Sequence, residues 1–217
     1  MLELRFGKNS EEPKQFLFIG AHCDDIEIGC GGAVLRLVKE YPQATFCWIV
    51  LSSSQRRALE AKRSADLFLS GVMAKELVIK DFRNSYFPYV GAAIKEYFEE
   101  LRECHNPDVI FTHYGRDHHQ DHRLISELTW NTFRNHLILE YEIPKYDGDL
   151  GSPTVFFPLR EAEYQRKVDI LIECFTSESS KRWFSKDTFF GLMRLRGIEC
   201  NAPSGFSEAF YCRKVVI

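Results

Sequence analysis

The chain has 217 residues, of which 45% are hydrophobic and 27% are charged, a composition typical of a globular protein with a substantial core. The formal net charge is -3 without a long run of one sign, so we expect no binding to nucleic acid or to an anionic membrane. No apolar stretch is long enough to cross a bilayer, and the first residues lack the features of a signal peptide. We therefore expect a cytoplasmic protein with no integral membrane segment.

The seven cysteines support the same compartment. Their number is odd, most lie in apolar surroundings, and no CxxC pair occurs. This pattern indicates free thiols in a reducing environment and excludes a disulfide framework.

Apolar runs alternate with segments of helical periodicity along the first two thirds of the chain. Residues 1–14 are read as a strand followed by a loop. Apolar runs typical of buried strands occupy residues 16–21, 45–51 and 109–112, and residues 76–80 predict a further strand. Amphipathic segments that predict helices occupy residues 33–39, 56–70, 92–104 and 124–137. This alternation predicts an α/β fold with a mostly parallel sheet and helices on both faces.

The last third is less regular. Residues 146–153 predict a loop, residues 160–174 a helix, and residues 209–212 and 215–217 a closing strand. We find no internal repeat, low-complexity tract or linker, so we expect residues 1–217 to form a single domain.

A first polar cluster, His22 to Glu27, follows the first predicted strand. His22 and Asp25 are three positions apart, so one helical turn would bring them to one side, with Asp24 free to face a metal-bound water. Imidazole and carboxylate are typical ligands of catalytic zinc. Taken alone, however, such residues are equally typical of a helix cap and a solvated turn. The glycines at 29–32 do not match GxGxxG, and the acidic residues before them would repel a pyrophosphate, which disfavours a nucleotide cofactor.

A second polar cluster, Asp117 to His122, follows the fourth predicted strand. It holds three histidines, and His119 and His122 again lie one turn apart. A metal-binding imidazole needs a partner for its other nitrogen, which Asp117 or Asp121 could supply. The alternative is a polar loop with a helix cap. Because ligands bind beyond the carboxyl ends of parallel strands, we expect both clusters to form one site.

Two other histidines, His105 and His113, have no such neighbours in the sequence, and we interpret both as structural.

These residues resemble a known family. Residues 21–32 resemble the AHPDDxE…GxGG signature of the LmbE-like, or PIG-L, deacetylases, and Asp117 to Arg123 resembles the second motif of that family, HxDHR. Arg196-Gly197 with residues 207–210 is similar to its closing RG…AEAF stretch, and Asp149 to Gly151 looks like a segment of bacterial members. The resemblance covers nearly the whole chain.

The resemblance implies a Rossmann-like three-layer sandwich and a zinc-dependent hydrolase that removes the N-acetyl group from an N-acetylglucosamine-type sugar conjugate, a linear, non-peptide amide. It implies three metal ligands, His22, Asp25 and His122. The expected cofactor is Zn2+, although this ligand set also accepts Fe2+ or another divalent metal.

The resemblance also implies catalytic roles. Asp24 would be the general base for a zinc-activated water, and His119 would be the electrophile and acid, oriented by Asp121. The sequence departs from the family at Cys23, where proline is usual, and at residues 174–178, where members often carry a His and a Ser-Gln pair. The second departure bears on the substrate more than on the chemistry.

Two alternatives remain open from the sequence: another metal hydrolase, such as a phosphoesterase, and a sugar-binding protein that kept the fold without turnover. Arg83 and Asn84 could reach a sugar. Arg56, Arg57 and Arg63 could meet a phosphate or solvate a helix face. The sequence identifies neither the conjugate, with Asp149 to Gly151 slightly favouring surface sugars, nor an oligomeric state, so a homo-oligomer is left open.

Overall fold

A single mixed sheet organises the part of the chain that the computed structural model describes, which is Phe6 and residues 15–216. Its strands are β1 (Gln15–Gly20), β2 (Thr45–Val50), β3 (Ala74–Ile79), β4 (Val109–His113), β5 (Leu137–Tyr141), β6 (Val155–Pro158) and β7 (Ser207–Tyr211). The helices are α1 (Asp25–Glu40), α2 (Gln55–Phe68), α3 (Gly91–Cys104), α4 (Gln120–Thr132), α5 (Glu161–Cys174) and α6 (Lys186–Glu199), with short 3-10 turns η1 (Phe87–Tyr89) and η2 (Thr176–Glu178). None of these helices is long and apolar enough to cross a membrane.

The order of the strands is β3-β2-β1-β4-β5-β7-β6. The five strands from β3 to β5 run parallel, and β7 pairs antiparallel with both β5 and β6. The predicted mostly parallel α/β sheet is therefore confirmed.

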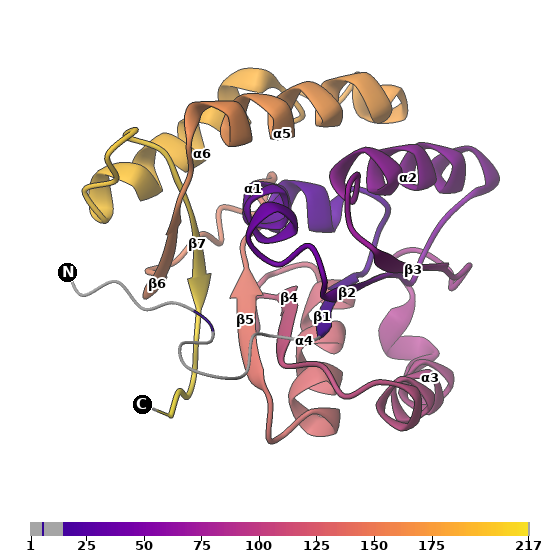
Figure 1. Cartoon of the computed structure of the whole chain (residues 1–217). Helices are drawn as coiled ribbons and strands as arrows, with labels where there is room; N and C mark the ends of the chain where they lie inside the picture. The colour runs from indigo at the N-terminus through magenta and orange to yellow at the C-terminus, as the bar shows by residue number, and fades with distance from the viewer. Residues whose placement is uncertain (1–5, 7–14, 217) are drawn as a thin grey trace.

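Helices cover both faces of the sheet, as Figure 1 shows. Alternate residues of each central strand serve the two faces, so Phe16 and Phe18 of β1 pack under α1, α2 and α5, whereas Leu17 and Ile19 pack against α3 and α4. The three layers follow from strands that are apolar on both sides.

Several helices and strands differ from the sequence predictions. The predicted helix 124–137 ends at Thr132, and Leu137–Tyr141 forms β5 instead. The run Leu-Ile-Leu pairs in register with β4, and burial on both faces of the sheet outweighs its helical periodicity. The predictions also missed β6 and α6. Val215 and Val216 form no strand, while Ile217 and most of the segment 1–14 lie outside the described residues.

Helix α1 starts eight residues earlier than predicted, at Asp25, and is kinked at Cys30, where φ is -142° and ψ is 16°. The carboxylate of Glu208 in β7 accepts hydrogen bonds from the backbone amides of Gly32 (2.7 Å) and Ala33 (2.6 Å), just after the kink. The glycine-rich segment therefore bends a helix and provides no cradle for a phosphate.

The order in which successive strands are added to the sheet reverses between β1 and β4, which are parallel and lie side by side at the centre of the sheet. From β1 the chain continues to β2 and β3 on one side, and from β4 it continues to β5 on the other. Such a switch point opens a crevice beyond the carboxyl ends of the two strands. The first polar cluster follows β1 and the second follows β4, so both reach this crevice.

Candidate metal centre

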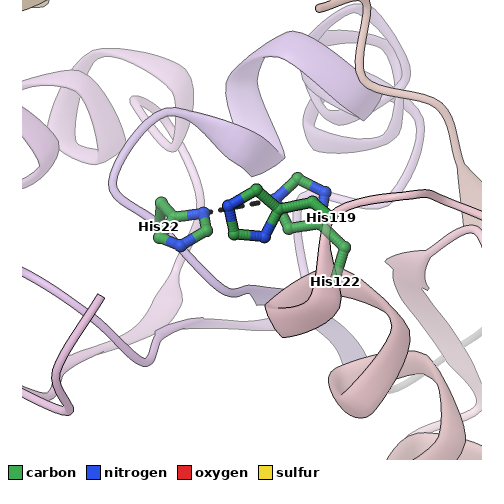
Figure 2. Close-up of side chains that lie close together, drawn as sticks. All are labelled: His22, His119 and His122. Atoms are coloured by element: carbon green, nitrogen blue, oxygen red, sulfur yellow. Dashed lines mark hydrogen bonds between the residues drawn. The ribbon is translucent and has the colours of Figure 1, made fainter. Parts of the chain in front are cut away.

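The fold brings His22 and His122, which lie 100 positions apart in the sequence, into contact. Figure 2 shows their rings together with the ring of His119, which lies on the same side of α4. His22 stands in the turn between β1 and α1, and His122 stands in the first turn of α4. The expectation that both clusters form one site agrees with this geometry.

The side chains of His22, Asp25 and His122 form a compact triangle, in which each histidine contacts a different carboxylate oxygen of Asp25. His22 Nδ1 lies 3.2 Å from His122 Nε2 and 3.3 Å from Asp25 Oδ2, and His122 Nε2 lies 3.5 Å from Asp25 Oδ1. Ligands of tetrahedral zinc at about 2.0–2.1 Å are separated by about 3.3 Å, and each of these three contacts is close to that separation. The residues fit a divalent metal without rearrangement of the backbone.

Two further histidines extend the cluster of possible ligands. The groups His22/His119/His122 and Asp25/His113/His122 each keep one ligand atom per residue within 4.8 Å of the others. His119 Nδ1 accepts a hydrogen bond from the backbone amide of Asp121 (3.2 Å). The proton of a neutral His119 ring therefore sits on Nε2, which suits a hydrogen-bond donor better than a ligand.

Each ligand histidine has a carboxylate on its second nitrogen. His122 Nδ1 contacts Asp117 Oδ2 at 2.9 Å, and His22 Nε2 contacts Asp121 Oδ2 at 3.2 Å. Such contacts fix the tautomer and the orientation of a metal-binding imidazole. The sequence left open which aspartate has this role, and in the structure each of them serves one histidine.

Asp121 contacts the His119 ring through its backbone and not through its carboxylate. Its backbone amide contacts the His119 ring, whereas its carboxylate accepts the backbone amides of Ser85 (2.6 Å) and Phe87 (3.1 Å) as well as contacting His22. The cause is the start of α4, where His119 occupies the N-cap position. Through these contacts Asp121 connects the backbone at Ser85 and Phe87 to the histidine cluster.

Asp24 is held by an arginine. Its Oδ1 lies 2.7 Å from Arg57 Nη2, and Arg57 also forms an ion pair with the buried carboxylate of Glu178 in η2. The sequence analysis allowed Arg57 either to contact a phosphate or to solvate a helix face. In the structure Arg57 does neither, because it pairs with two carboxylates. Glu178 lies in the segment where the sequence departs from the family, so that departure supplies the partner of Arg57.

The two ligand histidines differ in pKa because their surroundings differ. Burial lowers the pKa of His22, but the carboxylates of Asp25 and Asp121 outweigh this effect and raise it to about 10. Burial, together with the neighbouring His113, lowers the pKa of His122 to about 3. In the absence of a metal, His22 thus carries the proton that compensates Asp25, and a divalent cation would replace that proton.

His113 is a member of the cluster that the sequence analysis set apart. It ends β4, it is fully buried, and its Nε2 lies 2.9 Å from the backbone amide of Ala21 and 3.2 Å from Asp25 Oδ2. Its ring stacks on His122 with centroids 3.9 Å apart. The sequence could have indicated this role, because His113 is the last residue of a strand at the switch point of the sheet, where a binding site is expected.

Comparison with known proteins identifies the family of the chain. The PIG-L family, described as GlcNAc-PI de-N-acetylase, matches residues 17–133, which is more than half of the chain and includes both clusters.

The fold is similar to three solved structures. The conserved protein TT1542 from Thermus thermophilus has 16% identity and a TM-score of 0.74, and the match covers 94% of this chain and 96% of that one. The N,N'-diacetylchitobiose deacetylase from Pyrococcus horikoshii has 18% identity and a TM-score of 0.65, with 92% of this chain and 84% of that one covered. GalB, the 4-carboxy-2-hydroxymuconate hydratase from Pseudomonas putida, has 13% identity and a TM-score of 0.69, with 94% and 98% covered. At these identities the likeness establishes the fold, since a deacetylase and a hydratase share it. The family match, which spans both clusters, establishes that the chain belongs to the PIG-L family.

Proposed function

We propose that this protein is a metal-dependent hydrolase that removes the N-acetyl group from an N-acetylglucosamine-type sugar conjugate. The observation that carries the proposal is the triangle of His22, Asp25 and His122 in a chain of the PIG-L family. The proposed metal is Zn2+, with Fe2+ as the main substitute. When bound, such a metal polarises the amide carbonyl and lowers the pKa of a coordinated water from about 15.7 to about 7.

Asp24 is the proposed general base. Arg57 holds its Oδ1, so proton transfer falls to Oδ2. Burial raises the pKa of Asp24 to about 6, against the opposing effect of Arg57, which brings the carboxyl close to the pH at which a base works best. Asp24 would take a proton from the attacking water and later help to deliver it to the leaving amine.

His119 is the proposed electrophile and acid. Because its Nδ1 accepts the Asp121 amide, its Nε2–H is free to donate to the oxygen that becomes negative when the amide is attacked. Loss of one such donor typically costs about 100- to 1000-fold in turnover. Asp121 supports both sides of the site, through its amide on His119 and its carboxylate on His22.

The phosphoesterase alternative has little support in the structure. The three arginines that could meet a phosphate are all paired with carboxylates, Arg56 with Glu60, Arg57 with Asp24 and Glu178, and Arg63 with Glu173. A two-metal site would also want more carboxylates than the triangle offers.

Acetate release from a panel of N-acetylglucosamine conjugates tests the proposal, with metal-loaded and chelator-treated protein compared side by side. We expect metal-dependent release. The variant Asp24→Asn should keep its metal and lose about 100- to 10,000-fold in turnover, whereas His122→Ala should lose the metal itself. Asp66→Asn, which changes an exposed carboxylate on α2, is the matched control. Full activity of Asp24→Asn, or phosphate release in place of acetate, would overturn the assignment.

A further inference from the structure

A buried lysine lies behind the candidate metal centre, outside both sequence motifs. We infer that Lys145 and Asp149 position the ligand His122, by holding Asp117 and the loop that contains it. The inference rests on the proposed metal centre, and it assigns a role to the Asp149 to Gly151 segment, which the proposed reaction does not use. Lys145 and Asp149 belong to the loop between β5 and β6.

One carboxylate oxygen connects the lysine to the ligand. Asp117 Oδ2 lies 2.9 Å from His122 Nδ1 and 2.9 Å from Lys145 Nζ. The side chains of His122, Asp117 and Lys145 are only 3%, 2% and 9% exposed, so water screens these contacts weakly. With Nδ1–H donating to Asp117, the Nε2 of His122 keeps its lone pair for the metal.

Asp149 completes the support from the other side. Its Oδ2 lies 2.6 Å from Lys145 Nζ and accepts a hydrogen bond from the backbone amide of His118 at 2.7 Å. Asp117 Oδ1 in turn accepts the backbone amide of His119 at 2.8 Å. The two carboxylates that bind the lysine thus also hold two consecutive backbone amides of the second motif, those of His118 and His119.

The ammonium group keeps the two carboxylates in place. Asp117 and Asp149 both bind Lys145 Nζ through Oδ2, so without the lysine two buried negative charges would face each other across the space it leaves. Their repulsion would pull Asp117 away from His122 or free the loop at His118. Either movement would misalign the ligand, and loss of such an outer partner typically weakens metal binding by about 10- to 100-fold.

A loop clamp with no influence on the metal is the competing explanation, and metal affinity separates the two. We would measure the dissociation constant for Zn2+ by competition with a chelator, and record the absorption spectrum of the Co2+ form, for the wild type, Lys145→Met, Lys145→Arg and Asp149→Asn. Urea unfolding of each metal-free variant gives its stability. Lys167→Met is the control, because Lys167 is also a buried lysine paired with a carboxylate, Glu208, and its other contact is the backbone oxygen of Ile28 in α1, outside the second motif and the loop that holds Lys145.

We expect Lys145→Met to weaken Zn2+ binding by about 10- to 100-fold and to alter the Co2+ spectrum, and Lys145→Arg to retain most of the affinity. Lys167→Met should lose stability and keep the wild-type dissociation constant. A folded Lys145→Met protein with wild-type affinity would overturn the inference. If Lys145→Met does not fold, Asp149→Asn decides, and unchanged affinity in that variant also overturns it. A wild-type protein that binds no divalent metal would overturn the proposed metal centre and this inference together, an outcome distinct from the others.

Discussion

Replacing Gly29 by alanine tests whether the glycine-rich segment of α1 is required for packing. An added Cβ at this position would lie 2.1 Å from Cδ2 and 2.5 Å from Cγ of Tyr141. Cβ atoms essentially never lie closer than 3.0 Å to another heavy atom, so the ring or the helix would have to retreat by at least about 0.9 Å, and by about 1.4 Å to reach the optimal separation of about 3.5 Å. Tyr141 is fully buried in β5, and its hydroxyl donates to the backbone oxygen of Ile19 at 2.7 Å.

We expect Gly29→Ala to lower the free energy of unfolding by about 1–3 kcal/mol. Overpacking of a core typically costs about 1–3 kcal/mol and weakening the Tyr141 hydrogen bond adds about 1 kcal/mol, while the better helix propensity of alanine offsets about 0.5–1 kcal/mol. The displacement should also reach the metal centre, because the Tyr141 ring lies 4.8 Å from the ring of His113, which contacts Asp25. Weaker metal binding should therefore accompany the loss of stability.

Urea unfolding, followed by circular dichroism, measures the effect, and Gly191→Ala is the matched control. Gly191 lies within α6, and an added Cβ there meets nothing within 4 Å. The same substitution should therefore raise stability by about 0.5–1 kcal/mol, since alanine is the better helix former. If Gly29→Ala were as stable as the wild type, the close contact between α1 and β5 would not exist as described.

Two further predictions concern buried groups. Glu208→Gln would leave Lys167 without its 2.6 Å ion pair in the core, and we expect a loss of about 3–5 kcal/mol in urea unfolding, whereas a loss below about 1 kcal/mol would contradict the described network. For the cysteines, burial raises the pKa of Cys23 to about 12 and that of Cys47 to about 11, so neither forms the reactive thiolate at pH 8. A maleimide should label Cys104, which is exposed, and Cys212, which is half-buried, before any other thiol, and mass spectrometry of the native protein would show early labelling of Cys23 if this were wrong.

Much of the fold could be predicted from the sequence because it depends on local pattern. The strands β1, β2 and β4 are apolar on both faces, β3 contains the apolar run Leu-Val-Ile, and each is followed by a segment of helical period, so their type and order were predictable. The local pattern gave the wrong prediction at Leu137–Tyr141, where an apolar run is compatible with both helix and strand. Pairing with β4 decided that case, and pairing is a tertiary property.

The site divides in the same way. The two clusters could be predicted from the sequence, because imidazoles and carboxylates spaced by one turn after predicted strands are a local signal. The choice of His22, Asp25 and His122 within them came from the resemblance to the PIG-L family, whose match spans both clusters. Only the tertiary structure placed His113 against Asp25, Arg57 and Glu178 beside Asp24, and Lys145 behind Asp117. These partners come from other strands and loops, so their contacts depend on the order of the sheet and the course of the loops, which no local pattern encodes.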